Sequence, residues 1–142
     1  MPDVGVVRKR VRFAIDAARR DQAERRGRAA EAAKAFEVFL DSAAAPAFRM
    51  MANVLKAEGL AFDVMTPSGG VRLNSDRNRD DAIELELDSS VDPPEPLVTI
   101  TRARGSRVVR KERPVKPGTP LVQLTEDDVV EMLIDELRPW LV

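Results

Sequence analysis

The sequence has 142 residues, enough for one hydrophobic core of ordinary size, and a formal net charge of only -1. It contains no Cys, His or Tyr, which excludes disulfides, thiol catalysis and any site built on His, the commonest general base and metal ligand. We therefore expect a non-catalytic single domain over residues 1–142, with no cofactor, no bound metal and no small-molecule substrate.

The sequence also gives an expectation about location. The first residues are basic but lead into no apolar segment, and no later run of about 18 apolar residues could span a bilayer. The lack of Cys suits a reducing compartment. We expect neither export nor membrane insertion, and a cytoplasmic protein.

Apolar residues at helical spacing predict a helix over residues 6–41, within a helical arm of residues 1–41. Val7, Val11, Ile15 and Ala18 fall on one side of this helix. A second set, from Ala29 to Leu40, falls on nearly the same side. So long a stripe exceeds what one small sheet can cover, which makes Val7, Val11, Ile15 and Ala18 candidates for an oligomer interface.

Between these two sets the apolar stripe is interrupted by the segment RRDQAERRGR, residues 19–28. Acid-first pairs such as Asp21 with Arg25 and Glu24 with Arg28 have the i,i+4 spacing that supports a solvated helix. Gly27 is the expected place for a bend. The pattern leaves open whether residues 6–41 form one helix or two.

A short helix is expected over residues 45–58, with Pro46 in its first turn and Gly59 as its stop. From Leu60 the apolar period changes to two, and the segment SGG at residues 68–70 suits a tight hairpin turn. The clearest alternation is in residues 82–88. Together these patterns predict an antiparallel meander of four or five strands over residues 60–116.

The last element is a helix over residues 125–138, where Thr125 and Asp128 form a capping-box pattern. Its stripe of Val130, Leu133, Ile134, Leu137 and Leu141 is widened by Val129, Met132 and Trp140. So broad an apolar surface predicts that the helix covers the sheet and also touches another helix or another subunit, which adds Met132 and Trp140 to the interface candidates. The fold class is therefore α+β.

Two acidic segments resemble sites but have simpler interpretations. The segment DRNRDD, residues 76–81, begins like a calcium loop but lacks the Gly and the bidentate Glu that such a loop needs. We interpret it as a polar connection between strands. Glu84, Glu86 and Asp88 share one strand face, and their alternation with core residues is typical of an exposed face rather than of paired catalytic carboxylates.

Charge is strongly segregated along the chain. Residues 1–34 hold ten Lys or Arg against five Asp or Glu, net +5, whereas residues 35–142 hold 13 against 19, net -6. Within the acidic part, residues 102–116 hold seven bases against one acid, net +6. We call residues 102–116 the basic hairpin. Its candidate anion- or partner-binding residues are Arg102, Arg104, Arg107, Arg110, Lys111 and Arg113.

Three uses of these charges remain open: binding of phosphate backbones, docking of another protein, or protection of a sheet edge from unwanted pairing. The basic hairpin contains no aromatic residue on which bases could stack. We therefore expect a protein–protein interaction module that forms homo-oligomers. Nucleic-acid binding through the basic hairpin and the N-terminal basic helix is the alternative. We recognise no family motif in the sequence.

Overall fold

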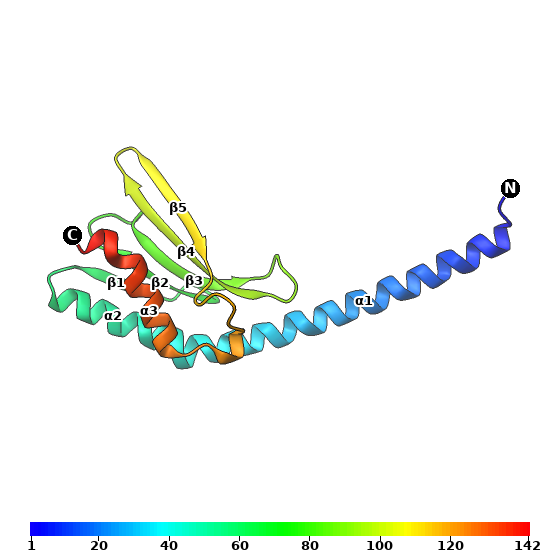
Figure 1. Cartoon of the computed structure of the whole chain (residues 1–142), viewed down its shortest axis with the longest axis horizontal. Helices are drawn as coiled ribbons and strands as arrows, with labels where there is room; N and C mark the ends of the chain where they lie inside the picture. Colours follow the sequence, from blue (N-terminus) through cyan, green and yellow to red (C-terminus); the bar gives the residue numbers. More distant parts are fainter.

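The computed structural model describes residues 1–142 as a long helix, a five-stranded sheet and a closing helix (Figure 1). The predicted α+β class is confirmed. The helices are α1 (Val4–Phe39), α2 (Ala45–Ala57) and α3 (Glu126–Leu137), with a π-helical turn at Leu40–Ala44 and short 3-10 turns at Leu121–Gln123 and Arg138–Trp140. The strands are β1 (Phe62–Met65), β2 (Gly70–Ser75), β3 (Ala82–Asp88), β4 (Glu95–Arg104) and β5 (Arg107–Arg113).

Residues 6–41 form one continuous helical segment, because α1 runs from Val4 to Phe39 and passes directly into the π-helical turn. Helix α1 passes through Gly27 without interruption, so the bend expected there is wrong. The chain instead changes direction between α1 and α2 (Figure 1). Pro46 at the start of α2 lacks an N–H, and its ring would clash with a carbonyl four residues earlier. The π-helical turn includes that earlier residue, Ser42, and accommodates the proline without ending the helix.

The sheet is a simple antiparallel meander in the order β1-β2-β3-β4-β5. Gly69 and Gly105 have positive φ values, 77° and 62°, in the turns that join β1 to β2 and β4 to β5. Gly adopts such values without strain, which is why the chain turns at these positions, the first of them in the predicted segment 68–70. Strand β5 ends at Arg113, immediately before Pro114, as a proline at an edge strand predicts.

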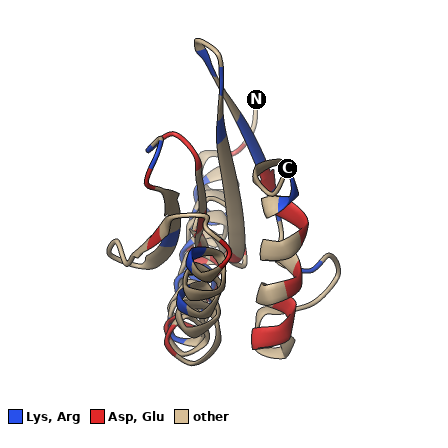
Figure 2. Cartoon of the chain, turned by 90° about the vertical axis from the view of Figure 1, so that its left-hand side faces the viewer, with Lys and Arg blue, Asp and Glu red and all other residues tan.

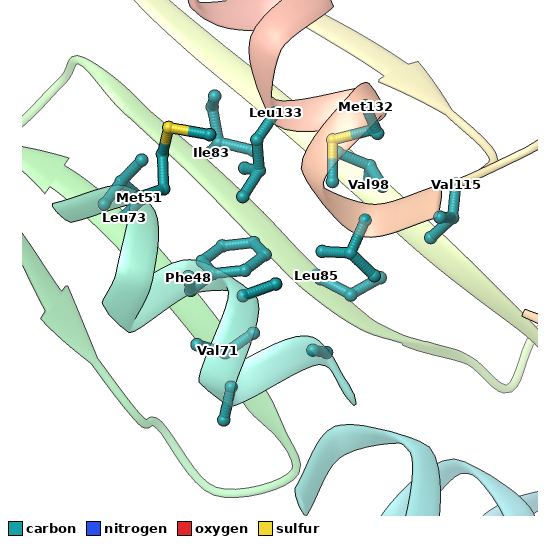
Figure 3. Packing of buried hydrophobic residues seen from close by; sticks show 14 of the residues in the cluster. Phe48, Met51, Val71, Leu73, Ile83, Leu85, Val98, Val115, Met132 and Leu133 are labelled. Atoms are coloured by element: carbon teal, nitrogen blue, oxygen red, sulfur yellow. The ribbon is translucent and has the colours of Figure 1, made fainter. Parts of the chain in front are cut away.

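The core lies between one face of the sheet and the helices α2 and α3. Ile83 and Leu85 of β3 are at most 1% exposed, and they alternate with Glu84 and Glu86 on the opposite face. Figure 3 shows side chains from α2 and α3 directed toward the strand residues. Phe48, at 0% exposure, is the largest fully buried side chain and comes from α2.

Helix α3 begins with the predicted capping box, in which the Asp128 backbone N–H donates to Thr125 Oγ1 and the Thr125 N–H donates to Asp128 Oδ2. This hydrogen bonding holds the pKa of Asp128 below its ordinary value. The buried side of α3 carries Val129, Met132, Leu133 and Leu137, whereas Ile134 and Leu141 of the predicted stripe are exposed. Because α3 contacts α2 as well as covering the sheet, the prediction that it touches another helix is confirmed.

The other face of the sheet is polar and uncovered. Arg72 on β2 donates to Glu84 Oε2 on β3 across 3.0 Å and to Asn74 Oδ1 across 3.0 Å. The pair of Arg72 with Glu84 joins two strands, and a cross-strand pair of this kind stabilises a sheet by fractions of a kcal/mol up to about 1 kcal/mol. The interaction of Glu84 with Arg72 agrees with the interpretation of the β3 acids as an ordinary exposed face.

Candidate interaction surfaces

The first part of α1 projects from the rest of the molecule (Figure 1). From Val4 to Arg28 every residue except Ala17 is exposed, and burial of α1 increases only from Ala29 onward. We call residues 4–28 the arm. At the standard helical rise the arm is about 38 Å long. Over residues 4–24 it is a solvated helix, and no hydrogen bond or ion pair joins this part to another element of the chain.

The arm carries its exposed apolar residues on two sides. Val7, Val11 and Ile15 are 42%, 52% and 45% exposed and belong to one stripe, which also includes Ala18. Val6 and Phe13 are also exposed, and they lie about 140° around the helix from this stripe. The structure thus brings the four predicted arm residues onto one surface and adds a second, smaller apolar group that the stripe analysis missed.

The arm is anchored to the loop between β3 and β4. Arg28 donates to both carboxylate oxygens of Asp92, with Nε–Oδ1 at 3.0 Å and Nη2–Oδ2 at 2.8 Å. Arg25 lies 3.4 Å from the same carboxylate. The hydrogen bond from Arg28 holds the pKa of Asp92 below its ordinary value, and the bond to Asp92 raises the pKa of Arg28.

This anchor replaces the helical ion pairs that the sequence predicted. No salt bridge forms between Asp21 and Arg25 or between Glu24 and Arg28. Exposed i,i+4 pairs contribute only a few tenths of a kcal/mol, so a bidentate partner at Asp92 competes with them easily. Asp92 was not singled out in the sequence, because a contact between residues 64 positions apart leaves no local signal.

Half of the predicted anion-binding residues of the basic hairpin have acidic partners in the fold. Lys111 Nζ lies 2.9 Å from Glu136 Oε1, and Arg113 Nη1 lies 3.2 Å from the same oxygen. Arg110 lies 3.2 Å from Glu112 on the same strand. Figure 2 shows the acidic residues of α3 beside the basic strands of the hairpin. The net charge of residues 102–116 in the sequence therefore overstates the local field.

Glu136 is the acid that the sequence analysis missed. It is 8% exposed and comes from the buried side of α3, next to Leu137. Arg113 also donates to the carbonyl oxygens of Pro114 and Val115, which fixes its guanidinium beside Glu136. An acid within the apolar stripe of a helix is the one signal that could have indicated a buried ion pair.

The other three candidate residues of the basic hairpin, Arg102, Arg104 and Arg107, lie toward its turn. Arg104 and Arg107 are opposite each other in the β4–β5 register, exposed, and without an ion pair. Arg102 lies over the ring of Trp140, with 5.8 Å between its guanidinium carbon and the ring centroid. Such a contact is a cation–π interaction. The structure thus brings an aromatic ring to the hairpin from a distant segment.

The two interface candidates near the C-terminus differ in their accessibility. Met132 is 1% exposed and lies in the core, because α3 packs against both α2 and the sheet. Met132 is therefore not available to a partner on this surface, which corrects the expectation from the sequence. Trp140 is partly buried, packs edge-on against Phe62 at 6.0 Å between ring centroids, and keeps one side toward Arg102.

An apolar cleft of about 700 Å³ lies where the arm meets the rest of the molecule. Ala32 and Ala35 of α1 form one wall, and two proline-containing segments contribute the others: residues 93–96, which lead into β4, and residues 114–122, which follow β5. Arg28 and Lys116 at the cleft are engaged by Asp92 and Asp128. No polar side chain that is buried and unpaired points into this cleft, so its chemistry indicates no particular small molecule.

Several further features bear on chemistry. No group of three or more Asp or Glu side chains is placed to hold a metal ion. A hydrogen bond between Asp63 and Asp76 raises the pKa of Asp76 above its ordinary value. In the segment of residues 76–81, which begins like a calcium loop, Asp81 accepts a hydrogen bond from the Ala103 N–H at 2.8 Å.

None of the helices combines the length and apolar character that a membrane span requires.

The fold and its surfaces define a small α+β protein with a projecting, amphipathic helical arm. Comparison of the chain with protein-family models, with curated proteins and with solved structures finds no match. The functional argument therefore depends on the surfaces themselves.

Proposed function

We propose that the protein is a non-catalytic protein–protein interaction module that forms homo-oligomers through the arm. The observation that carries this proposal is the exposure of Val7, Val11 and Ile15 on a helix that contacts nothing else over residues 4–24. An amphipathic helix in a protein gains most of its stability from burying its apolar side, and here Val7, Val11 and Ile15 stay exposed. A second helix packed on the stripe would bury these apolar side chains and so stabilise the arm.

The charges of the basic hairpin favour this function over phosphate binding. Because Lys111, Arg113 and Arg110 already have acidic partners, a phosphate would have to compete with Glu136 and Glu112 for them. Nucleic-acid binding remains the alternative, supported by Arg104 and Arg107 and by Arg102 over Trp140. Affinity for mixed DNA and RNA at low salt, compared with that of Arg104→Glu/Arg107→Glu/Arg110→Glu, tests the alternative. Undetectable affinity, or affinity unchanged in the triple variant, would eliminate it.

Light scattering of the full chain over a wide concentration range tests the oligomer. We expect the mean mass to rise above 15.7 kDa with concentration. The variant Val7→Glu/Val11→Glu should be monomeric, because it places two charges in the apolar stripe. The matched control is Val6→Glu/Phe13→Glu, which makes the same change in charge and a similar change in apolar content on another side of the helix. A wild type that is monomeric at every concentration contradicts the proposal.

A further inference from the structure

The arm's apolar stripe follows a repeat of alternating three and four residues. Val4, Val7, Val11, Ala14 and Ala18 continue this spacing, which is the repeat that a second helix follows when it winds around the first. The next positions in the same series are Asp21, Arg25 and Arg28. At Arg25 and Arg28 this side of the helix already contacts Asp92 in the β3–β4 loop. A partner helix therefore has room along residues 4–21, about 27 Å, and no farther.

We propose, on the basis of the homo-oligomer argued above, that two copies of the chain pair through residues 4–21 of their arms in antiparallel orientation. The sizes of the stripe residues support this orientation. Antiparallel pairing can place Val7 opposite Ala18 and Val11 opposite Ala14 of the other copy, so that each of these four central layers holds one large and one small side chain. At the two ends of this register Val4 lies opposite Asp21, at the limit of the paired segment. Parallel pairing instead stacks Val on Val and Ala on Ala, which leaves wide and narrow layers in one short interface.

Charge favours the same orientation. Arg8, Lys9, Arg10 and Arg12 form a dense basic segment, and none of them has an ion pair within the chain. Parallel pairing would place this segment beside its own copy. In the antiparallel register it faces residues 13–17, which contain Asp16 and no base. The repulsion between like charges is therefore smaller, and the two bodies lie at opposite ends of the pair.

The absence of natural Cys makes the orientation measurable by cross-linking. In the variant Val7→Cys/Ala18→Cys the two thiols lie about 16 Å apart along one rigid helix, too far for a disulfide within one chain. Oxidation should therefore give a covalent dimer as the main product. The matched control is Val6→Cys/Ala17→Cys, with the same residue types and spacing but on another side of the arm. It should remain mostly monomeric.

The single variant Val7→Cys distinguishes the two orientations. Antiparallel pairing keeps the substituted position 7 of one copy far from that of the other, whereas parallel pairing brings the two thiols together. Efficient cross-linking of Val7→Cys alone, or equal cross-linking of the stripe variant and its control, would overturn the antiparallel pair. A chain that is dimeric by light scattering but shows no 7–18 link would refute only this inference. A monomeric chain would refute the proposed function as well.

Discussion

Glu136 links helix α3 to strand β5 through one carboxylate. It accepts from Lys111 and Arg113 on the edge strand β5, and it belongs to the buried side of α3. Removing one partner of a buried ion pair leaves the remaining charge buried without a compensating partner, which is costly. The pair therefore matters to the docking of α3 on β5 more than a surface salt bridge would.

We predict that Glu136→Gln lowers the free energy of unfolding by about 1–3 kcal/mol. The range lies below that for a fully buried pair because the Lys111 side chain is 62% exposed and can return to water. Chemical denaturation measures the change. Glu131→Gln, on the exposed side of the same helix and without an ion pair, is the control and should change stability very little. Equal effects of the two substitutions would show that the ion pairs of Glu136 with Lys111 and Arg113 contribute nothing to stability.

Asp92 has a similar linking position, at the surface. Because its folded-state pKa lies below the unfolded value, its contribution to stability is complete above the ordinary pKa of 3.8 and is lost as the pH falls through the lower folded value. We predict that Asp92→Asn at neutral pH increases amide hydrogen exchange in the loop 89–94 and around Arg25 and Arg28.

The pH dependence provides the check on this prediction. The difference in exchange between wild type and Asp92→Asn should disappear as the pH is lowered below the folded pKa of Asp92, because the carboxyl of the wild type is then also uncharged. Exchange rates must be corrected for their intrinsic dependence on pH. A difference that persists unchanged into strong acid would mean that the Arg28 contact does not anchor the arm.

At the scale of elements, the strands were predictable because their signal is local. The alternation of Ile83, Leu85 and Leu87 with acids defined β3, and the segment SGG at residues 68–70 marked the turn in which Gly69 has a positive φ. The path from α1 into α2 was not predictable, because Pro46 normally starts a new helix and a π-helical turn has no reliable sequence pattern.

The surfaces were predictable in part for the same reason. The arm's stripe is periodic in the sequence, and so Val7, Val11, Ile15 and Ala18 were found together. The partners of the basic hairpin were not found, because Glu136 is 23 residues or more from the bases that it contacts. Local charge counts cannot anticipate such contacts.

Gly27 gives a test of the arm as an element. It lies in the interior of α1, and a Cβ at this position would meet nothing within 4 Å. Gly27→Ala should therefore stabilise the helix locally by about 0.5–1 kcal/mol, since Gly costs more backbone entropy than Ala. Amide exchange over residues 22–31 should slow by roughly two- to fivefold. Ala23→Gly, one turn earlier, should have the opposite effect, and a faster exchange in Gly27→Ala would show that the helix needs a flexible point there.

At the scale of the whole molecule, salt separates the two functions, because the two kinds of complex respond to it with opposite sign. Residues 4–21 carry six bases and two acids, net +4, so two arms repel each other as they pair through their apolar stripes. Raising the salt from about 0.1 M to about 1 M shortens the screening length from roughly 10 to roughly 3 Å and removes much of this repulsion. Binding to a phosphate backbone instead weakens steeply with salt, because it depends on the release of counterions.

We therefore predict that self-association strengthens by a few-fold over this range of salt, measured as the dissociation constant by sedimentation equilibrium. Arg8→Gln/Lys9→Gln should reduce the salt dependence, since it lowers the charge of each arm by two without touching the stripe. Val7→Glu/Val11→Glu should remain monomeric at high salt, because the two added charges still face an apolar partner. Self-association that weakens as salt rises would mean that opposite charges hold the copies together, which contradicts an interface made by the apolar stripes of two arms that repel each other.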